Sequence, residues 1–188
     1  MLVALVTMLI ITLAAVALVR TTLATAAASG KVAIRTNLSV AGLAAVEAAL
    51  VMLHGDAALS DPDVDAPANN YFSSRQAGED ARGVPAVLQS RAAYPVDART
   101  LVAGDLSVRF VVERLCTAPG AAVAERCTLS PPSLAAIVGP ADPGELAPAP
   151  YYRVSARIDA PDESVGFVQA MLGPGSAARR LAWRVLDE

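Results

Sequence analysis

The chain has 188 residues but contains a single Lys, a single His and two Cys, and only 4% of its residues are aromatic. A net charge of −3 with so little Lys excludes a nucleic-acid binder, which needs a basic surface. One His and two Cys cannot furnish the four ligands of a structural zinc site. A hydrophobic content of 54% excludes intrinsic disorder over the whole length.

The sequence also lacks the motifs of common active sites. It contains no G-x-S-x-G, no H-E-x-x-H, no P-loop and no G-x-G-x-x-G. The lone His54 sits at the end of a predicted helix, where a cation suits the helix dipole. We therefore predict a protein that is not an enzyme, with no catalytic residue, no metal and no cofactor.

Charge is missing entirely from residues 1–19, which read MLVALVTMLIITLAAVALV. Nineteen helical residues span about 28 Å, close to the ~30 Å hydrocarbon core of a bilayer. This run predicts a membrane-spanning helix. An alternative is a secretory signal peptide cut within Thr22–Ala28 (TLATAAA), although the basic n-region is missing and the apolar run is long for that class.

The nearest positive charges, Arg20, Lys31 and Arg35, follow the apolar run, and the first acidic residue is Glu47. Taken literally, the positive-inside rule would place the C-terminal part inside the cell. We prefer the alternative that a short basic leader precedes Met1.

Helix-forming sequence continues from Arg20 to about Leu53, without any Pro before Pro62. An apolar face is predicted from spacings of three and four among Leu43, Val46, Leu50 and Leu53. We expect one helix of about 53 residues, bent or melted most easily at Gly30 and Gly42. The alternative is two helices separated by a turn at Ser29-Gly30.

Residues 54–188 are predicted to form a globular domain, after the helix of residues 1–53. Asp56–Asn70 and Pro131–Pro150 have the composition of loops. Asp61, Asp63 and Asp65 resemble the start of a calcium loop, but the mid-loop Gly and the closing Glu are missing. A solvated acidic loop is the better prediction.

Four strands are predicted from alternating apolar and polar residues. They are Leu106–Leu115, Tyr152–Ile158, a run that begins with Val165 and Phe167, and Leu181–Leu186. The second and third form an antiparallel hairpin. We expect a small antiparallel sheet whose apolar face is covered by residues 43–53 and whose other face, with Arg153, Ser155 and Arg157, is polar. The predicted fold class is α+β.

Cys116 and Cys127 follow the first of these strands. In an exported domain such a pair is expected to form a disulfide. The alternative is two free thiols in a cytosolic protein.

Two segments resemble a known family. Residues 9–20 (LIITLAAVALVR) combine an apolar run, a central T-L and a closing Arg, and YYRVSARIDAP with SVGFVQAML forms a Y-R-V strand followed by a strand carrying V-Q. Together with the long helix and the disulfide-bearing sheet, they resemble a type IV pilin, and more narrowly the minor pilins of the PilX type (the pilus assembly protein PilX family). The chain differs from major pilins in having no acidic residue near the start of the helix.

The resemblance implies a pilin-like fold and a structural role in priming type IV pilus assembly, with a place in a tip complex. The helix would lie in the inner membrane before assembly and in the filament core afterwards, with the C-terminal domain in the periplasm and then on the pilus surface. The residues expected to face lipid and then neighbouring helices are Leu2, Leu5, Leu9, Ile10, Leu13 and Val16. The implied partners are other minor pilins, the major pilin and the pilus assembly machinery, and adhesion and twitching motility would follow.

Two alternatives remain open at this point. A minor pseudopilin of type II secretion shares the same plan of helix and sheet. A signal-anchored or secreted periplasmic binding domain would use the apolar run only for export.

Overall fold

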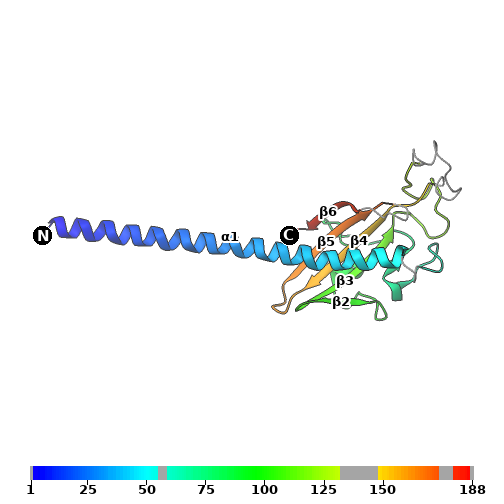
Figure 1. Ribbon diagram of the computed structural model, residues 1–188, viewed down its shortest axis with the longest axis horizontal. Helices are drawn as coiled ribbons and strands as arrows, with labels where there is room; N and C mark the ends of the chain where they lie inside the picture. The colour runs from blue at the N-terminus through cyan, green and yellow to red at the C-terminus, as the bar shows by residue number, and fades with distance from the viewer. Residues whose placement is uncertain (1, 55–58, 132–147, 174–179, 187–188) are drawn as a thin grey trace. The chain divides into compact units, whose positions relative to one another are not determined.

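The computed structural model describes residues 2–54, 59–131, 148–173 and 180–186 (Figure 1). For residues 2, 27–28, 31–33, 35 and 180–181 the description covers the backbone and not the side chain. The chain divides into two compact units, Met1–Asn37 and Leu38–Glu188. The fold class is α+β, as predicted.

The first element is helix α1, Leu2–His54. Its end at His54 agrees with the predicted end near Leu53, where the next residue is Gly55. The backbone is helical through Ser29 and Gly30, so the alternative of two helices separated by a turn there is wrong.

Six strands form one sheet in the order β1-β3-β4-β5-β6, with β2 also paired to β3. The bounds are β1 Tyr71–Phe72, β2 Thr100–Ala103, β3 Leu106–Arg114, β4 Tyr152–Asp159, β5 Val165–Leu172 and β6 Arg180–Leu186. The four predicted strands correspond to β3, β4, β5 and β6, and β4 and β5 form the predicted hairpin. The sheet is mixed rather than antiparallel, because the short β1 pairs in parallel with β3.

The last part of α1 packs on one face of this sheet (Figure 1). Small side chains are prominent among its buried residues: Ala41, Ala45 and Ala49 are buried together with Val46. The larger Leu50 and Leu53 pack beside them, partly buried. They meet the apolar positions of the central strands, among them Val108, Phe110, Val112, Val154, Ala156, Ile158, Val168 and Ala170. Leu43, which was predicted to belong to the buried face, is exposed. The helix therefore approaches the sheet through its alanines.

Gly42 allows this close approach. A Cβ at Gly42 would lie 2.5 Å from an atom of the Trp183 ring and 2.6 Å from a methyl of Val168. Gly42 was predicted as a point of bending or melting, but it lies inside the helix and is buried. A similar contact occurs at Gly166, where a Cβ would meet Leu38.

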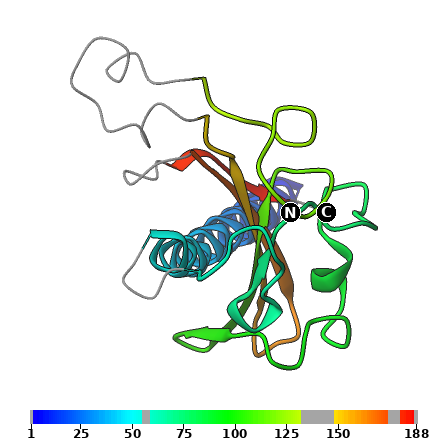
Figure 2. The same ribbon diagram turned by 90° about the vertical axis from the view of Figure 1, so that its right-hand side faces the viewer.

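The second face of the sheet, which was predicted to be polar, is also covered. Residues 73–99, which include helix α2 (Ala86–Gln89), cross this face on the side opposite α1 (Figure 2). A second apolar cluster forms there from Phe72, Val84, Leu88, Tyr94, Val111 and Phe167. Arg153, Ser155 and Arg157 are buried beneath the same segment. The strands thus have two interior faces.

Of the two segments predicted as loops, residues 59–70 contain turns and a single 3₁₀ helix, Pro67–Asn69. Residues 55–58 lie outside the described residues. Of the predicted loop Pro131–Pro150, residues 132–147 also lie outside the described residues.

Candidate functional site

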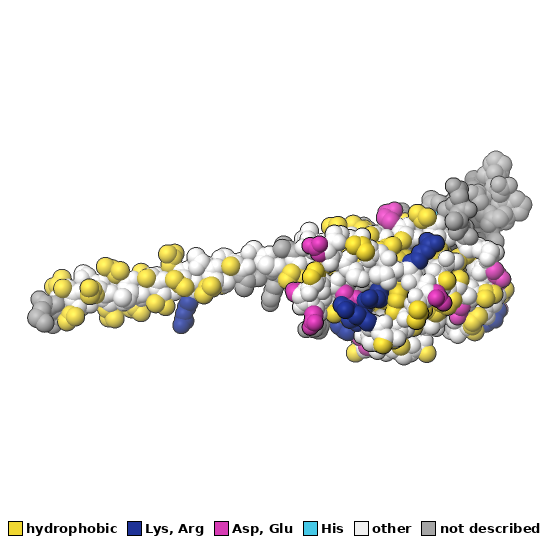
Figure 3. Space-filling view, turned by 90° about the horizontal axis from the view of Figure 1, so that it is seen from below, with side chains coloured by type: hydrophobic (Ala, Val, Ile, Leu, Met, Phe, Trp, Pro, Cys, Tyr) yellow, Lys and Arg dark blue, Asp and Glu magenta, His cyan; other side chains and the backbone are white. Residues whose placement is uncertain are grey.

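The first candidate site is the apolar part of α1, Val3–Ala26, which is long and apolar enough to cross a membrane. Every side chain in this stretch is exposed in the isolated chain, including those of Leu5, Leu9, Ile10, Leu13 and Val16, with exposed fractions between 53% and 64%. The side chain of Leu2 lies outside the description. Apolar side chains follow one another along this segment in Figure 3. A helix that is apolar all round requires an apolar environment, either lipid or other protein.

The threonine hydroxyls of this stretch are satisfied within the helix. The hydroxyls of Thr7 and Thr12 donate to the carbonyl oxygens of Ala4 and Leu9, at 3.0 and 2.9 Å. Thr21 and Thr22 donate in the same way to carbonyls one turn back. Because unsatisfied polar groups are costly in hydrocarbon, this arrangement suits an apolar environment.

Arg20 is the one charged residue between Val3 and Ala26. Its side chain is exposed, and about 26 Å of helix separates it from Val3 at 1.5 Å per residue. A guanidinium at that distance reaches the boundary of a ~30 Å hydrocarbon core, where a long basic side chain can extend into the headgroup layer.

A second stretch of α1, Thr36–His54, passes the same test of length and composition. Its buried residues contact the sheet, so its apolar character is explained by the core of the globular unit. The N-terminal stretch has no such explanation within its own compact unit.

The globular unit carries the disulfide. The sulfur atoms of Cys116 and Cys127 are bonded at 2.07 Å, as the sequence predicted. The adjacent Arg114 is almost fully buried and donates to the carbonyl of Ser73 at 3.0 Å, to the carbonyl of Gly120 and to Asp63 at 2.7 Å. This arginine joins the disulfide loop to the acidic loop.

The acidic loop is exposed to solvent, as predicted, and its carboxylates also accept hydrogen bonds from protein donors. Asp61 accepts the backbone N–H of Asp63 at 2.9 Å, and Asp65 accepts both the N–H and the hydroxyl of Ser73 at 2.7 Å. Asp63 pairs with Arg114. Among the residues that the structure describes, no group of three potential ligands could hold a metal ion.

A buried ion network holds residues 73–99 to the sheet. Glu113, which is fully buried on β3, accepts the backbone N–H of Gln76 at 2.7 Å and the guanidinium of Arg153 at 2.9 Å. Arg153 also donates to Glu79 at 2.6 Å. Burial raises the pKa of Glu113, while the hydrogen bond from Arg153 lowers the pKa of Glu79. Both Glu113 oxygens are occupied, so the arrangement is that of a structural link.

A second network surrounds Asp159 at the end of β4. Its carboxylate accepts from Arg157 at 3.0 Å, from Arg91 at 3.3 Å and from Arg109. Arg157 also donates to the carbonyl of Gln89 at 2.8 Å, at the end of α2. The polar residues on this face of the strands therefore bind the covering segment.

Asn70 is the residue whose role the sequence analysis missed most completely. It is fully buried and adopts a left-handed backbone conformation with φ of 61°. Its side-chain nitrogen donates to the carbonyls of Arg99 and Phe110, at 2.8 and 2.9 Å, and its side-chain oxygen accepts the N–H of Arg99 at 2.6 Å. The hydroxyl of Tyr94 donates to the carbonyl of Arg99 at 2.6 Å, and burial raises the pKa of Tyr94 to about 12. An Asn in a sequence assigned to a loop gave no signal of this role.

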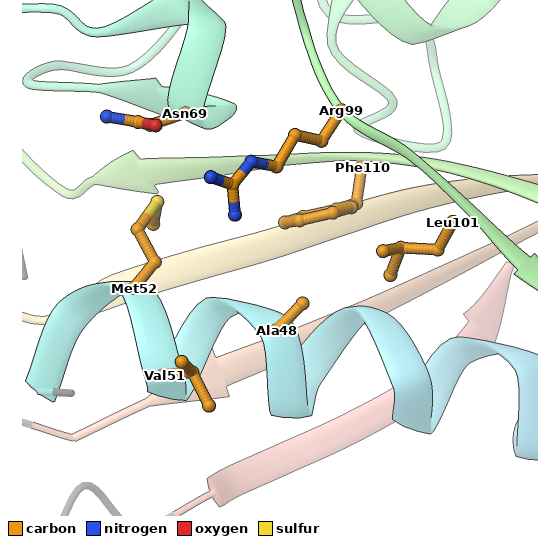
Figure 4. A pocket seen from close by; sticks show the side chains of 7 residues that line it. All are labelled: Ala48, Val51, Met52, Asn69, Arg99, Leu101 and Phe110. Carbon is orange, nitrogen blue, oxygen red and sulfur yellow. The ribbon is translucent and has the colours of Figure 1, made fainter. Parts of the chain in front are cut away.

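A cavity of about 230 Å³ lies beside this junction (Figure 4). Ala48, Val51 and Met52 of α1 form one wall, and Leu101 and Phe110 form the other. Asn69 and Arg99 supply its polar groups.

The comparisons with known proteins add no assignment: no protein-family model, no curated protein and no solved structure matches the chain. The class that the fold and the site define is therefore a coarse one. It is an α+β protein with an exposed apolar N-terminal helix, suited to a membrane anchor or a signal sequence, a mixed sheet and a disulfide.

Proposed function

We propose that this protein is a minor pilin of the PilX type, a structural subunit that primes assembly of type IV pili and takes its place in a tip complex. One observation carries the proposal. The single helix α1 contains both the bare apolar stretch Val3–Ala26 and the alanine-rich stretch that packs into the sheet. A cleaved export signal has no need of a helix that continues into the folded core.

The same exposed apolar side chains would suit two successive environments, first lipid and then the filament core. In the inner membrane, Leu5, Leu9 and Leu13 would contact lipid. In a filament the same side chains would contact the helices of neighbouring subunits. The transfer exchanges one apolar surround for another, so it carries little hydrophobic cost, and close packing between helices can drive it.

The globular unit fits the periplasmic side of this proposal. Its disulfide belongs to an oxidising compartment. Its ion networks, in which buried arginines bind carboxylates and carbonyls, join the covering segment to the sheet. The proposed partners are other minor pilins, the major pilin and the assembly machinery.

N-terminal mass spectrometry of the native protein from the membrane fraction tests the proposal. Cells with and without prepilin peptidase provide the comparison. The proposal predicts a peptidase-dependent start at or within a few residues of Met1, with a methylated amine. A start near Ser29 in both strains would overturn it.

A secreted or signal-anchored binding domain is the second candidate function. It is favoured by the position of the second compact unit, which begins at Leu38, after the predicted cleavage segment Thr22–Ala28. A type II secretion pseudopilin would give the same mass spectrum as a pilin. Deleting either the pilus assembly ATPase or the secretion ATPase distinguishes them, since only the cognate deletion would leave the subunit confined to the membrane.

A further inference from the structure

Arg99 is the one arginine between residues 38 and 188 whose described side chain has no hydrogen-bond or ion-pair partner in the structure. All other arginines described there bind a carboxylate, an amide oxygen or a backbone carbonyl. They are Arg75, Arg82, Arg91, Arg109, Arg114, Arg126, Arg153, Arg157 and Arg184. Arg99 is exposed, so its guanidinium is accessible to a partner from outside the chain.

The backbone of Arg99 is held firmly even though its side chain is not. Asn70 binds both its N–H and its carbonyl, and Tyr94 donates to the same carbonyl. The side chain extends along the cavity beside Phe110, toward Met52 and Asn69 (Figure 4). The guanidinium is therefore presented at an apolar cavity from a fixed base.

The size and the charge of the cavity define what would fill it. Its volume of about 230 Å³ is below the ~300–1,000 Å³ of typical small-molecule sites, and one or two aliphatic side chains would occupy it. The positive charge of the Arg99 guanidinium would be neutralised by a carboxylate next to those aliphatic side chains. The matching ligand is an aliphatic side chain adjacent to an acidic residue.

The chain presents this pair of side chains itself. The N–H of Ala98 donates to the carbonyl of Pro95 at 3.1 Å, which places Val96 and Asp97 at the tip of a turn. Val96 is 100% exposed, and the exposed Asp97 has no partner among the described residues. Single exposed apolar residues are common, but this one adjoins an unpaired carboxylate and lies three residues before the unpaired Arg99.

We propose that two copies of this chain associate through this face. Val96 of each copy enters the cavity of the other, and Asp97 of each copy pairs with Arg99 of the other. Arg99 lines the cavity and follows the Val96–Asp97 turn by two residues, so a twofold axis can bring the turn of each copy to the cavity of the other. The proposal concerns residues of the globular unit alone and does not depend on the proposed function. Its failure would leave the mass-spectrometric test unaffected, and the reverse also holds.

Disulfide crosslinking in the full chain, in native membranes, tests this contact. The described residues contain no free cysteine, so a crosslink formed under oxidation can come only from the introduced cysteines. Cells express one tagged copy with Val96→Cys and a second copy with Met52→Cys. The proposal predicts an oxidant-dependent heterodimer, whereas Val123→Cys, also exposed but on the disulfide loop, gives none with Met52→Cys.

Charge reversal tests the proposed contact between Asp97 of one copy and Arg99 of the other. Adding Asp97→Arg to the Val96→Cys copy places two arginines together and reduces the crosslink about tenfold, as does adding Arg99→Asp to the Met52→Cys copy alone. Both changes together, one in each copy, restore an Arg–Asp pair at both contacts and restore the crosslink. Circular dichroism checks that each variant is folded. Equal yields for Val96→Cys and Val123→Cys, no rescue in the mixed pair, or a crosslink only to a different protein would overturn the proposal.

Discussion

Replacing Arg153 by Met removes the central cation of the network that holds residues 73–99 to the sheet. Glu113 would then be fully buried with only the N–H of Gln76 as a donor, and Glu79 would lose its closest partner. Removing one partner from a buried ion pair costs roughly 3–5 kcal/mol because the remaining charge stays desolvated. We expect the free energy of unfolding to fall by about 3 kcal/mol at about pH 8.

The pH dependence of this loss has a definite sign. Burial already raises the pKa of Glu113 in the folded chain, and loss of Arg153 raises it further. A carboxyl with a raised folded pKa binds its proton more tightly when folded, so stability falls as the pH rises through the window between its unfolded and folded pKa. The pKa of Glu79 is lowered chiefly by Arg153, and that stabilisation at neutral pH is also lost. The difference between wild type and variant should therefore shrink to about 1 kcal/mol at about pH 5.

Urea denaturation of the full chain in detergent, followed by the fluorescence of Trp183, measures these differences. Arg75→Met is the matched control. It also contacts Glu79, but its side chain is 52% exposed, so its loss should cost under about 1 kcal/mol. Equal losses for the two variants, or a loss from Arg153→Met that is the same at both pH values, would refute the role of the buried network.

Three further predictions concern the helix and the disulfide. Gly42→Ala should destabilise the globular unit by about 1–2 kcal/mol, because overpacking against Trp183 and Val168 outweighs the gain of about 1 kcal/mol in helix propensity. Gly30→Ala should not be destabilising, because the added Cβ would meet no neighbouring side chain within 4 Å. Denaturation of both variants checks this difference. Replacing both Cys116 and Cys127 by Ser should lower the free energy of unfolding by about 3 kcal/mol, measured against wild type with and without reductant. Leu13→Arg should cost about 3 kcal/mol of insertion free energy and reduce the membrane-bound fraction, whereas Leu13→Phe should leave it unchanged, as fractionation and immunoblotting would show.

The sequence predicted those elements that have a regular period. The absence of Pro and the Ala-rich composition defined α1 to within a residue of its end, and alternation defined β3, β4 and β5. The disulfide between Cys116 and Cys127 was predicted from the expected export of the domain, and the two cysteines are bonded. The signals for the helix and the strands are local, so no knowledge of the tertiary structure was needed.

The second face of the sheet could not be predicted because its polar residues suggested solvent. Arg153 and Arg157 alternate with apolar residues as they would in a half-exposed strand. They are buried because strand carboxylates accept from both of them and because the covering segment adds the carboxylate of Glu79 for Arg153 and the carbonyl of Gln89 for Arg157. No local pattern encodes partners as distant in the sequence as those of the covering segment. The covering segment itself has irregular spacing between Val84, Leu88 and Tyr94, so no regular element was predicted there.

The contact face of α1 was predicted in part. Val46, Leu50 and Leu53 do pack on the sheet, but the prediction weighted large apolar residues, so it included the exposed Leu43 and omitted the buried alanines Ala41, Ala45 and Ala49. Small residues carry a weak hydrophobic signal, but they permit close approach of a helix to a sheet. The cavity at Arg99 was equally hidden, because its walls come from α1, β2 and β3.

The central claim is that one helix serves first as a membrane anchor and then as part of a filament. The most direct test is to quantify peptides from Val3–Ala26, relative to peptides from β4 and β5, in membranes and in sheared pili from cells with and without prepilin peptidase. The account predicts equal amounts of both peptides in the membranes and in the pili of normal cells, and retention in the membrane when the peptidase is absent. Peptides of the sheet found without the helix in the periplasm, or pili that lack both, would contradict it.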